Sequence, residues 1–225
     1  MRSAITGLYG IVDVSGSPQL DELTLARAWL GAGVTVLQLR MKGAAPTAVG
    51  ALLDELVPLC AAAGCLLIVN DHVGLAASRP GVGVHLGQDD ADPVAARALL
   101  GADRVIGWST HTLDQVAQAT ARAVDYIGFG PVFSAGGKHL AGSDRRAPMA
   151  ARGLGALSAA VAAATVPIVA IGGIDASRLP FVLATGVSAV AMISAVAQAP
   201  DPRRAAAELS AACRESHSER KPCAP

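Results

Sequence analysis

The sequence is poor in aromatic and charged residues, and each shortage excludes a class of function. Phe, Trp and Tyr make up 3% of the 225 residues, so a hydrophobic core must be built from Ala, Val, Leu and Ile. Charged residues make up 16%, with 18 basic residues balancing 18 acidic ones. Surfaces that bind nucleic acids or anionic membranes need an excess of Lys and Arg. We therefore expect no nucleic-acid partner and no membrane partner.

Long apolar segments and clustered cysteines are missing as well. No run of about 18 apolar residues is free of polar residues, Gly or Pro, which argues against a transmembrane helix. The first residues lack the sustained apolar stretch of a signal peptide. The 4 cysteines have neither C-x-x-C spacing nor the density of a disulfide scaffold. These absences predict a soluble, cytoplasmic protein with unpaired thiols.

Short apolar runs rich in Val, Ile and Leu recur along the chain, each followed by an Ala-rich stretch with helical spacing. We predict strands at residues 8–14, 34–39, 66–70, 82–86, 105–108, 126–130, 168–171 and 189–193. Residues typical of helix starts lie between the runs: Asp92 before Pro93, Thr112 with Gln115, and Asp201 before Pro202. Strands and helices therefore alternate throughout.

This alternation predicts a parallel sheet with crossover helices, either closed into a barrel or open and doubly wound. Eight repeats of about 28 residues each suit a barrel. No G-x-G-x-x-G motif, typical of a dinucleotide-binding fold, follows the first run. We predict an α/β protein with a single (β/α)8 TIM barrel over residues 1–213. The polar segment 214–225 is predicted to be a disordered tail.

The segment 131–152, between the sixth and seventh runs, is unusually rich in Gly and charge. In a barrel it would leave the C-terminal face, where active sites are assembled. The segment is therefore either a lid over the site or simply a flexible connection.

Polar residues gather where the second run ends. Gln38, Arg40 and Lys42 alternate with Leu39 and Met41. In an extended segment, residues two apart point to the same side, so an amide and two cations would converge. Such a group suits a phosphate. The alternative is a charged strand end that faces solvent.

Carboxylates follow the next two runs, as Asp71 and Asp90. At the same end of adjacent strands, they suit Mg²⁺ that also contacts a substrate phosphate. Isolated Asp residues are also common helix N-caps, although Asp92 already fills that role for the following helix. His72 and His85 lack metal-ligand spacing, and we predict structural roles for both.

The later strand ends carry further polar groups. His111 could serve in acid–base chemistry or could form a hydrogen bond at the helix start beside it. Gly173 and Ser194 follow the seventh and eighth runs, where barrels commonly bind phosphate through backbone N–H groups. The sequence thus predicts two phosphate-binding regions at one mouth, one of them with a metal. A reaction between two phosphorylated partners would need this arrangement.

In combination, these motifs resemble the thiamine phosphate synthase family, also called thiamine-phosphate pyrophosphorylase. The resemblance spans residues 8 to about 212. It rests on the motifs Gln38-Leu-Arg-Met-Lys42, Asn70-Asp71, His85-Leu-Gly-Gln-Asp-Asp90, Ser109-Thr-His-Thr112, Asp125-Tyr-Ile-Gly-Phe-Gly-Pro131, Ile171-Gly-Gly-Ile174 and Ile193-Ser194.

The resemblance implies Mg²⁺-dependent alkyl transfer. A pyrimidine diphosphate ionises, and the nitrogen of a thiazole phosphate captures the carbocation, giving thiamine phosphate and pyrophosphate. Asp71 and Asp90 would hold Mg²⁺. The thiazole phosphate would contact Gly173, Ile193 and Ser194. The pyrimidine diphosphate would contact Gln38, Leu39, Arg40, Met41, Lys42, Asn70, Ser109 and Lys138. The predicted catalytic residues are Arg40, Ser109 and Lys138. Mg²⁺ and the cations Arg40, Lys42 and Lys138 would stabilise the leaving group.

One loop departs from the family pattern. The family usually carries T-x-T-K after the sixth strand, whereas this chain has Ala135, Gly136, Gly137 and Lys138. Lys138 is kept and both hydroxyls are missing. Losing two hydrogen bonds to the thiazole phosphate would cost about 1 to 3 kcal/mol, unless backbone N–H groups or Ser134 replace them.

Two alternatives stay open. A related thiazole tautomerase shares the barrel and transfers a proton with a histidine near the position of His111, but it does not need both metal aspartates. A non-catalytic barrel could instead sense a phosphorylated thiamine precursor. Presence of Asp71, Asp90 and Lys138 favours the synthase. The expected partners are small phosphorylated substrates, and the oligomeric state, a homo-oligomer included, stays open.

Overall fold

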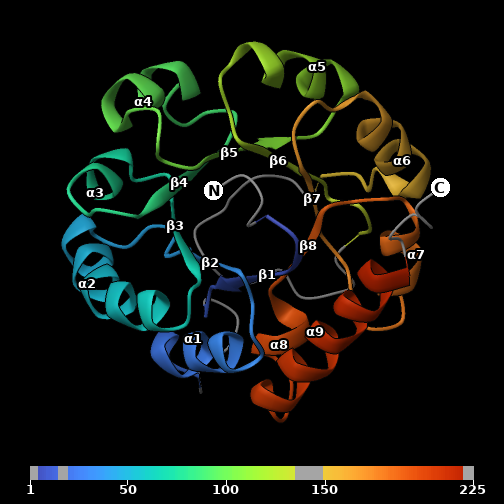
Figure 1. The fold of residues 1–225 in the computed structure, drawn as a ribbon, viewed down its shortest axis with the longest axis horizontal. Coiled ribbons are helices and arrows are strands. Elements are labelled where there is room, and N and C mark those ends of the chain that lie inside the picture. The colour runs from blue at the N-terminus through green and yellow to red at the C-terminus, as the bar shows by residue number, and fades with distance from the viewer. Residues whose placement is uncertain (1–4, 15–19, 135–148, 220–225) are drawn as a thin grey trace.

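A closed barrel of parallel strands forms the centre of the molecule (Figure 1). The computed structural model describes residues 5–14, 20–134 and 149–219. The strands pair in chain order, and β8 pairs with β1 to close the ring. They are β1 (Gly7–Val12), β2 (Val36–Leu39), β3 (Leu66–Asn70), β4 (Gly83–Leu86), β5 (Ile106–Thr110), β6 (Tyr126–Phe129), β7 (Ile168–Ile171) and β8 (Ala189–Met192). All the predicted strands are confirmed, and no end differs from its predicted position by more than two residues.

Helices follow the strands and surround the barrel (Figure 1). They are α1 (Glu22–Gly31), α2 (Pro46–Ala62), α3 (Val73–Ala77), α4 (Pro93–Leu100), α5 (Leu113–Ala121), α6 (Gly153–Ala163), α7 (Leu179–Ala184), α8 (Ser194–Ala197) and α9 (Pro202–Glu219). The predicted single (β/α)8 TIM barrel is confirmed. Over the described ranges, no helix combines the length and apolar character needed to span a membrane.

The helix caps explain where several of these helices begin. The Asp92 carboxylate accepts a hydrogen bond from Val94 N at 2.7 Å, and Asp201 accepts one from Arg204 N at 3.1 Å. Thr112 Oγ1 accepts from Gln115 N at 3.3 Å, which is half of the predicted capping box. The Gln115 side chain accepts from the backbone N–H of His111, one residue before the cap.

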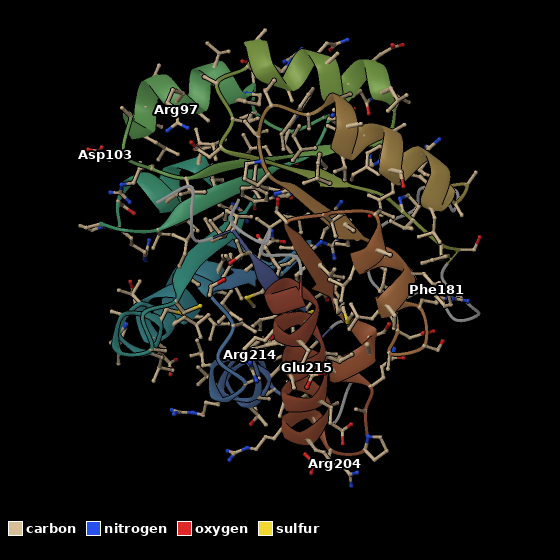
Figure 2. All side chains as sticks on the ribbon, turned by 45° about the vertical axis from the view of Figure 1, so that its right-hand side comes forward. Arg97, Asp103, Phe181, Arg204, Arg214 and Glu215 are labelled. Atoms are coloured by element: carbon tan, nitrogen blue, oxygen red, sulfur yellow. The ribbon has the colours of Figure 1, made fainter. Side chains whose placement is uncertain are left out.

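The last helix corrects the prediction of a disordered tail over residues 214–225. α9 continues to Glu219, and residues 220–225 lie outside the described ranges. Cys213 is buried, and Arg214 donates to Ser210 Oγ at 2.6 Å. α9 packs against α1 (Figure 1). The prediction relied on polar composition, whereas the exposed side of a surface helix is itself polar, as at Arg204, which pairs with Glu208 (Figure 2).

Cysteine behaves as predicted in the described part of the chain. Cys60, Cys65 and Cys213 are free thiols, and all are buried. Cys223 lies outside the described residues.

Two hydrophobic clusters divide the core. The larger one combines outward-facing strand residues with helix residues. The smaller one consists of Ile5 and strand residues and fills the barrel interior, where Tyr9 and Tyr126 are the largest side chains. Gly107 leaves the space for Tyr126, because a Cβ atom at Gly107 would lie 2.0 Å from the Tyr126 Cζ. The interior therefore depends on pairing small residues with large ones.

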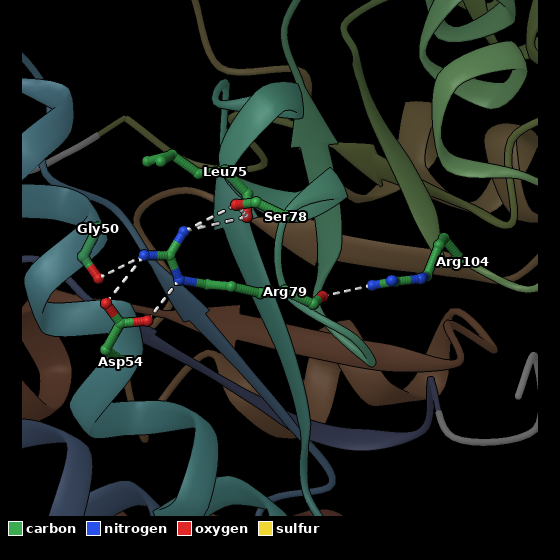
Figure 3. Close-up of polar contacts among 6 residues, drawn as sticks. All are labelled: Gly50, Asp54, Leu75, Ser78, Arg79 and Arg104. Carbon is green, nitrogen blue, oxygen red and sulfur yellow. Dashed lines mark hydrogen bonds and ion pairs between the residues drawn. The ribbon is translucent and has the colours of Figure 1, made fainter.

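Arginines secure the end of the barrel at which the strands begin (Figure 3). Arg79 pairs with Asp54 at 2.8 Å and donates to Gly50 O at 3.1 Å, which ties the turn after α3 to α2. Nη1 of Arg104 donates to Arg79 O at 2.6 Å and to Val82 O at 3.0 Å. These cations satisfy backbone carbonyls, so they serve the fold and not a ligand site.

We expect Gly107→Ala to lower the free energy of unfolding by about 1–3 kcal/mol, because the added methyl group overpacks the Tyr126 ring. The matched control is Gly155→Ala in α6, where nothing lies within 4 Å of the new Cβ atom. Alanine there should be neutral or stabilise by up to about 1 kcal/mol. Urea unfolding measures both, and equal midpoints for the two variants would contradict the packing argument.

Candidate functional site

The predicted site residues lie at or just after the carboxyl ends of the strands, which share one rim of the barrel. β2 carries Gln38 and Leu39, Asn70 ends β3, and Ser109 lies near the end of β5. Ser194 begins α8 directly after β8 and Ile193. Lys138 and the rest of residues 135–148 lie outside the described residues, so their roles stay predictions.

The predicted site residues at the end of β2 have side chains on two different sides of the sheet. Gln38 is buried, and its Nε2 donates to the hydroxyl of Tyr9 at 2.9 Å. Leu39 and Met41 pack into the cluster between sheet and helices, so their side chains face away from the barrel interior. The buried side chain of Leu39 is thus out of reach of a substrate, whereas Met41 is only partly buried.

Arg40 is held by a partner that the sequence did not reveal. Its Nη1 forms an ion pair and hydrogen bond with the carboxylate of Asp13, which is 3% exposed. Arg40 N also donates to Val12 O at 2.9 Å, joining the ends of β1 and β2. A carboxylate beside a guanidinium fixes the direction of its remaining donors. An acidic residue inside the first apolar run, Asp13, was the signal that could have pointed to this pair.

The carboxyl groups of Asp71 and Asp90 share a hydrogen bond. Asp71 adopts φ 66°, a left-handed conformation uncommon for non-glycine residues and often seen at functional sites. Asp71 N donates to His85 O at 2.9 Å, and Asp90 Oδ2 accepts from Gly87 N at 2.6 Å. Two adjacent strands thus bring the predicted metal ligands into contact.

This contact changes the proton affinity of Asp71. Burial raises its pKa to about 7, and the hydrogen bond and charge of Asp90 add to the rise. The cations Lys42 and Arg40 act in the opposite direction, which places their charges near the pair. Two crowded carboxyls that share a proton are an arrangement that a cation can relieve.

The donor set matches the chemistry of Mg²⁺. Within the described ranges, no three His, Cys, Asp or Glu residues form a group that could hold a metal ion. Mg²⁺ typically takes one or two carboxylates and completes its shell with water and substrate phosphates. Asp71 and Asp90 therefore fit a magnesium ion that is held jointly with a phosphorylated substrate.

His85, for which we predict a structural role, contacts the predicted site residue Ser109. Its Nδ1 lies 2.9 Å from the Tyr126 hydroxyl and its Nε2 lies 2.8 Å from Ser109 Oγ. Burial lowers the pKa of His85 to about 4, so the ring is neutral near pH 7. Burial raises the pKa of both Tyr9 and Tyr126, so both phenols keep their protons.

His111 takes part in a hydrogen-bonded group at the rim. Its Nδ1 donates to Gly130 O at 2.6 Å, and its backbone N–H donates to the Gln115 side chain. Gln115 donates to Gln88 at 3.1 Å, and Gln88 donates to Ser109 O at 2.5 Å. At the helix start it is thus the backbone of His111 that forms a hydrogen bond, whereas its ring bonds to the segment after β6, and an acid–base role for His111 stays a prediction.

Glycine is required at position 173, because the turn after β7 packs closely against the segment after β6. Its φ is 63°, and a Cβ atom there would lie 2.7 Å from Phe133 O and 2.8 Å from Ser134 O. Arg178 donates to Gly173 O at 2.6 Å and stacks over the Phe133 ring. The turn after β7 is thus fixed against the segment that leaves β6.

The Asp71–Asp90 pair makes the stability of the folded protein depend on pH. A carboxyl that binds its proton more tightly when folded loses stabilisation as the pH rises from about 4 to about 7, across the shift in pKa. In metal-free protein we expect stability to fall over this range, and Asp90→Asn to lower the pKa of Asp71. NMR titration of labelled carboxyl carbons measures the pKa, with Asp89→Asn as control. An unchanged pKa in Asp90→Asn would contradict the coupling.

The comparisons with known proteins agree with one another. The family described as thiamine monophosphate synthase matches residues 8–196. The thiamine-phosphate synthase of Chlorobium phaeovibrioides is 40% identical over 191 residues, covering 85% of this chain and 88% of the relative. That of Anaeromyxobacter dehalogenans is 38% identical over 211 residues, covering 94% of this chain and 89% of the relative.

A solved structure extends the agreement to three dimensions. The thiamine phosphate pyrophosphorylase from Pyrococcus furiosus superposes with a TM-score of 0.83 and 32% identity, covering 96% of this chain and 98% of that one. On this evidence, the chain belongs to the thiamine monophosphate synthase family.

Proposed function

We propose that this protein is a thiamine phosphate synthase. It condenses 4-amino-2-methyl-5-(diphosphooxymethyl)pyrimidine with thiazole phosphate and releases thiamine phosphate and pyrophosphate. The observation that carries the proposal is the Asp71–Asp90 pair, with Arg40 and Lys42 acting on it, at the active rim of a barrel of this family. We place the enzyme, with its phosphorylated substrates, in the cytoplasm.

The first step is departure of the diphosphate. The C–O bond of the pyrimidine methylene breaks, and its electron pair leaves with pyrophosphate. Asp71 and Asp90 would hold Mg²⁺, which neutralises diphosphate charge when bound. Arg40, aimed by Asp13, would donate to the same oxygens beside Lys42. Fixed cations stabilise charge where it develops, because they do not need to reorganise during the reaction.

The second step is capture of the carbocation by the thiazole nitrogen. The nitrogen lone pair forms the new C–N bond. We propose that Gln38, Asn70 and Ser109 hold the pyrimidine ring above the packed barrel interior, which keeps water from the cation. Gly173, Ile193 and Ser194 would bind the thiazole phosphate, and Lys138 would contact the diphosphate from its loop.

Neither alternative function, tautomerase or sensor, would use all the residues of the proposed site. A thiazole tautomerase would move a proton and would not use the Asp71–Asp90 pair. A sensor barrel would bind one phosphorylated ligand without turnover. Incubating the pure protein with both substrates and Mg²⁺, and measuring thiamine phosphate and pyrophosphate, separates the three functions. If the protein binds its substrates but forms no product, while a control synthase is active in the same assay, the proposed synthase function is refuted.

We expect Asp71→Asn to lower kcat by about a hundredfold or more by weakening Mg²⁺ binding. A higher Mg²⁺ concentration should restore part of the activity. Asp103→Asn is the matched control, because Asp103 is exposed in the turn before β5, at the opposite end of the barrel (Figure 2). Unchanged rate and unchanged Mg²⁺ dependence in Asp71→Asn would remove Asp71 from this role.

We expect Asp13→Asn to lower kcat/KM for the pyrimidine diphosphate by about 10- to 100-fold, since a misaimed Arg40 guanidinium loses its geometry with the leaving group. The control is Asp54→Asn, which removes the carboxylate from the Arg79 pair on the outside of the barrel. Steady-state kinetics measure both variants. Equal activities for Asp13→Asn and Asp54→Asn would show that Arg40 needs no aiming partner.

We expect Lys138→Ala to slow turnover more than it disturbs folding, because the side chain is proposed to act on the diphosphate. Turnover per folded molecule and the melting temperature are the two measurements. A collapsed melting temperature with normal turnover would contradict this role.

A further inference from the structure

A chain of hydrogen bonds crosses the barrel interior and joins two strand ends of the proposed site. Gln38 Nε2 lies 2.9 Å from the Tyr9 hydroxyl, which lies 2.8 Å from the Tyr126 hydroxyl. Tyr126 then contacts His85 Nδ1 at 2.9 Å, and His85 Nε2 contacts Ser109 Oγ at 2.8 Å. The chain thus begins and ends on residues assigned to the pyrimidine substrate.

The barrel interior leaves space for these hydrogen-bonded side chains. Tyr9 and Tyr126 are fully buried, and the centroids of their rings lie 5.9 Å apart. Gly107 leaves room for Tyr126, and a Cβ atom at Gly128 would approach His85 Cε1 to 3.2 Å. Larger residues on β5 or β6 would push the polar side chains apart. Buried polar groups are costly unless each is satisfied, and every link of this chain is made.

The donors along the chain set one direction. Gln38 Nε2 donates to the Tyr9 oxygen, and the Tyr9 proton has a partner among these hydrogen-bonded side chains when Tyr9 donates to Tyr126. Tyr126 then donates to His85 Nδ1, which leaves the ring proton on Nε2. His85 Nε2 donates to Ser109 Oγ, so the single Ser109 proton has to point elsewhere. This is the assignment in which each donor along the hydrogen bonds from Gln38 to Ser109 has an acceptor, and it fixes the proton of the His85 ring on Nε2.

We propose that His85 is a positioning residue that holds the Ser109 hydroxyl as a hydrogen-bond donor toward the pyrimidine diphosphate. The inference rests on the proposed function, and it adds His85, with Tyr9 and Tyr126 behind it, to the residues that prepare the site. A serine hydroxyl without this contact rotates freely and loses part of its orientation toward the substrate. His85 touches no substrate and acts through Ser109.

The first test is independent of activity. Nitrogen NMR of protein labelled on histidine reports which ring nitrogen carries the proton, and the signal that is lost in His85→Gln assigns His85. We expect the Nε2–H tautomer in the wild-type protein. The Nδ1–H tautomer would reverse the chain and overturn the proposal, whether or not the protein is a synthase.

The second test is a double-mutant cycle on kcat/KM for the pyrimidine diphosphate. We expect His85→Leu and Ser109→Ala each to lower it by about 10- to 100-fold, and the double variant to be little worse than either, because His85 acts only through Ser109. His85→Gln, whose amide can donate to Ser109, should recover part of the loss. Additive losses, or no recovery, would overturn the proposal.

A stability control separates positioning from general loosening of the fold. Val190→Ala removes buried methyl groups from the cluster between β8 and the helices. It should lower the urea midpoint without changing kcat/KM. If His85→Leu does not fold, Tyr126→Phe tests the same chain, because it keeps the ring and removes one hydroxyl. Unchanged tautomer and unchanged kcat/KM in Tyr126→Phe would overturn the proposal.

Discussion

A closed ring of parallel strands has an interior that side chains must fill, and this constraint governs the rest of the molecule. In this barrel Tyr9 and Tyr126 are the largest side chains of the interior, and Gly107 leaves space for the Tyr126 ring. A filled interior has no pore, so chemistry is confined to the rim. Because all the strands run in one direction, their carboxyl ends supply that rim together.

The balance of charge has a simple structural explanation. Arg79, Arg104 and Arg97 bind carbonyls and carboxylates away from the rim and serve the fold. Arg40 and Lys42 remain at the rim beside the Asp71–Asp90 pair. A protein with no net charge can thus keep a locally charged site at the rim.

The fold could be predicted from the sequence because each strand is a short apolar run with a helix signal after it. Strand ends also placed Asp71 and Asp90 at one rim, which the structure confirms. The hydrogen bonds through His85 could not be predicted, because they depend on side chains that the closed barrel brings together from distant segments. For the Arg40–Asp13 pair the sequence offered one signal, an acidic residue in the first apolar run, and did not name its partner. Periodicity indicates which residues are buried and not which atoms they meet.

For residues 214–219 the sequence analysis predicted disorder where the structure has helix. Residues 214–219 are polar in composition, yet they continue α9 because the helix already has a buried side that holds Leu209 and Cys213. Composition averages over a helix, whereas packing depends on one side of it.

The hydrogen bond between Asp71 and Asp90 also links metal binding to acidity. A proton and a divalent cation compete for the same carboxyl oxygens, so a cation that enters between them must release the proton. Affinity for the cation therefore weakens as the surroundings become more acidic. At the proposed Mg²⁺ site, this pair of acids would therefore make metal occupancy depend on the surrounding pH.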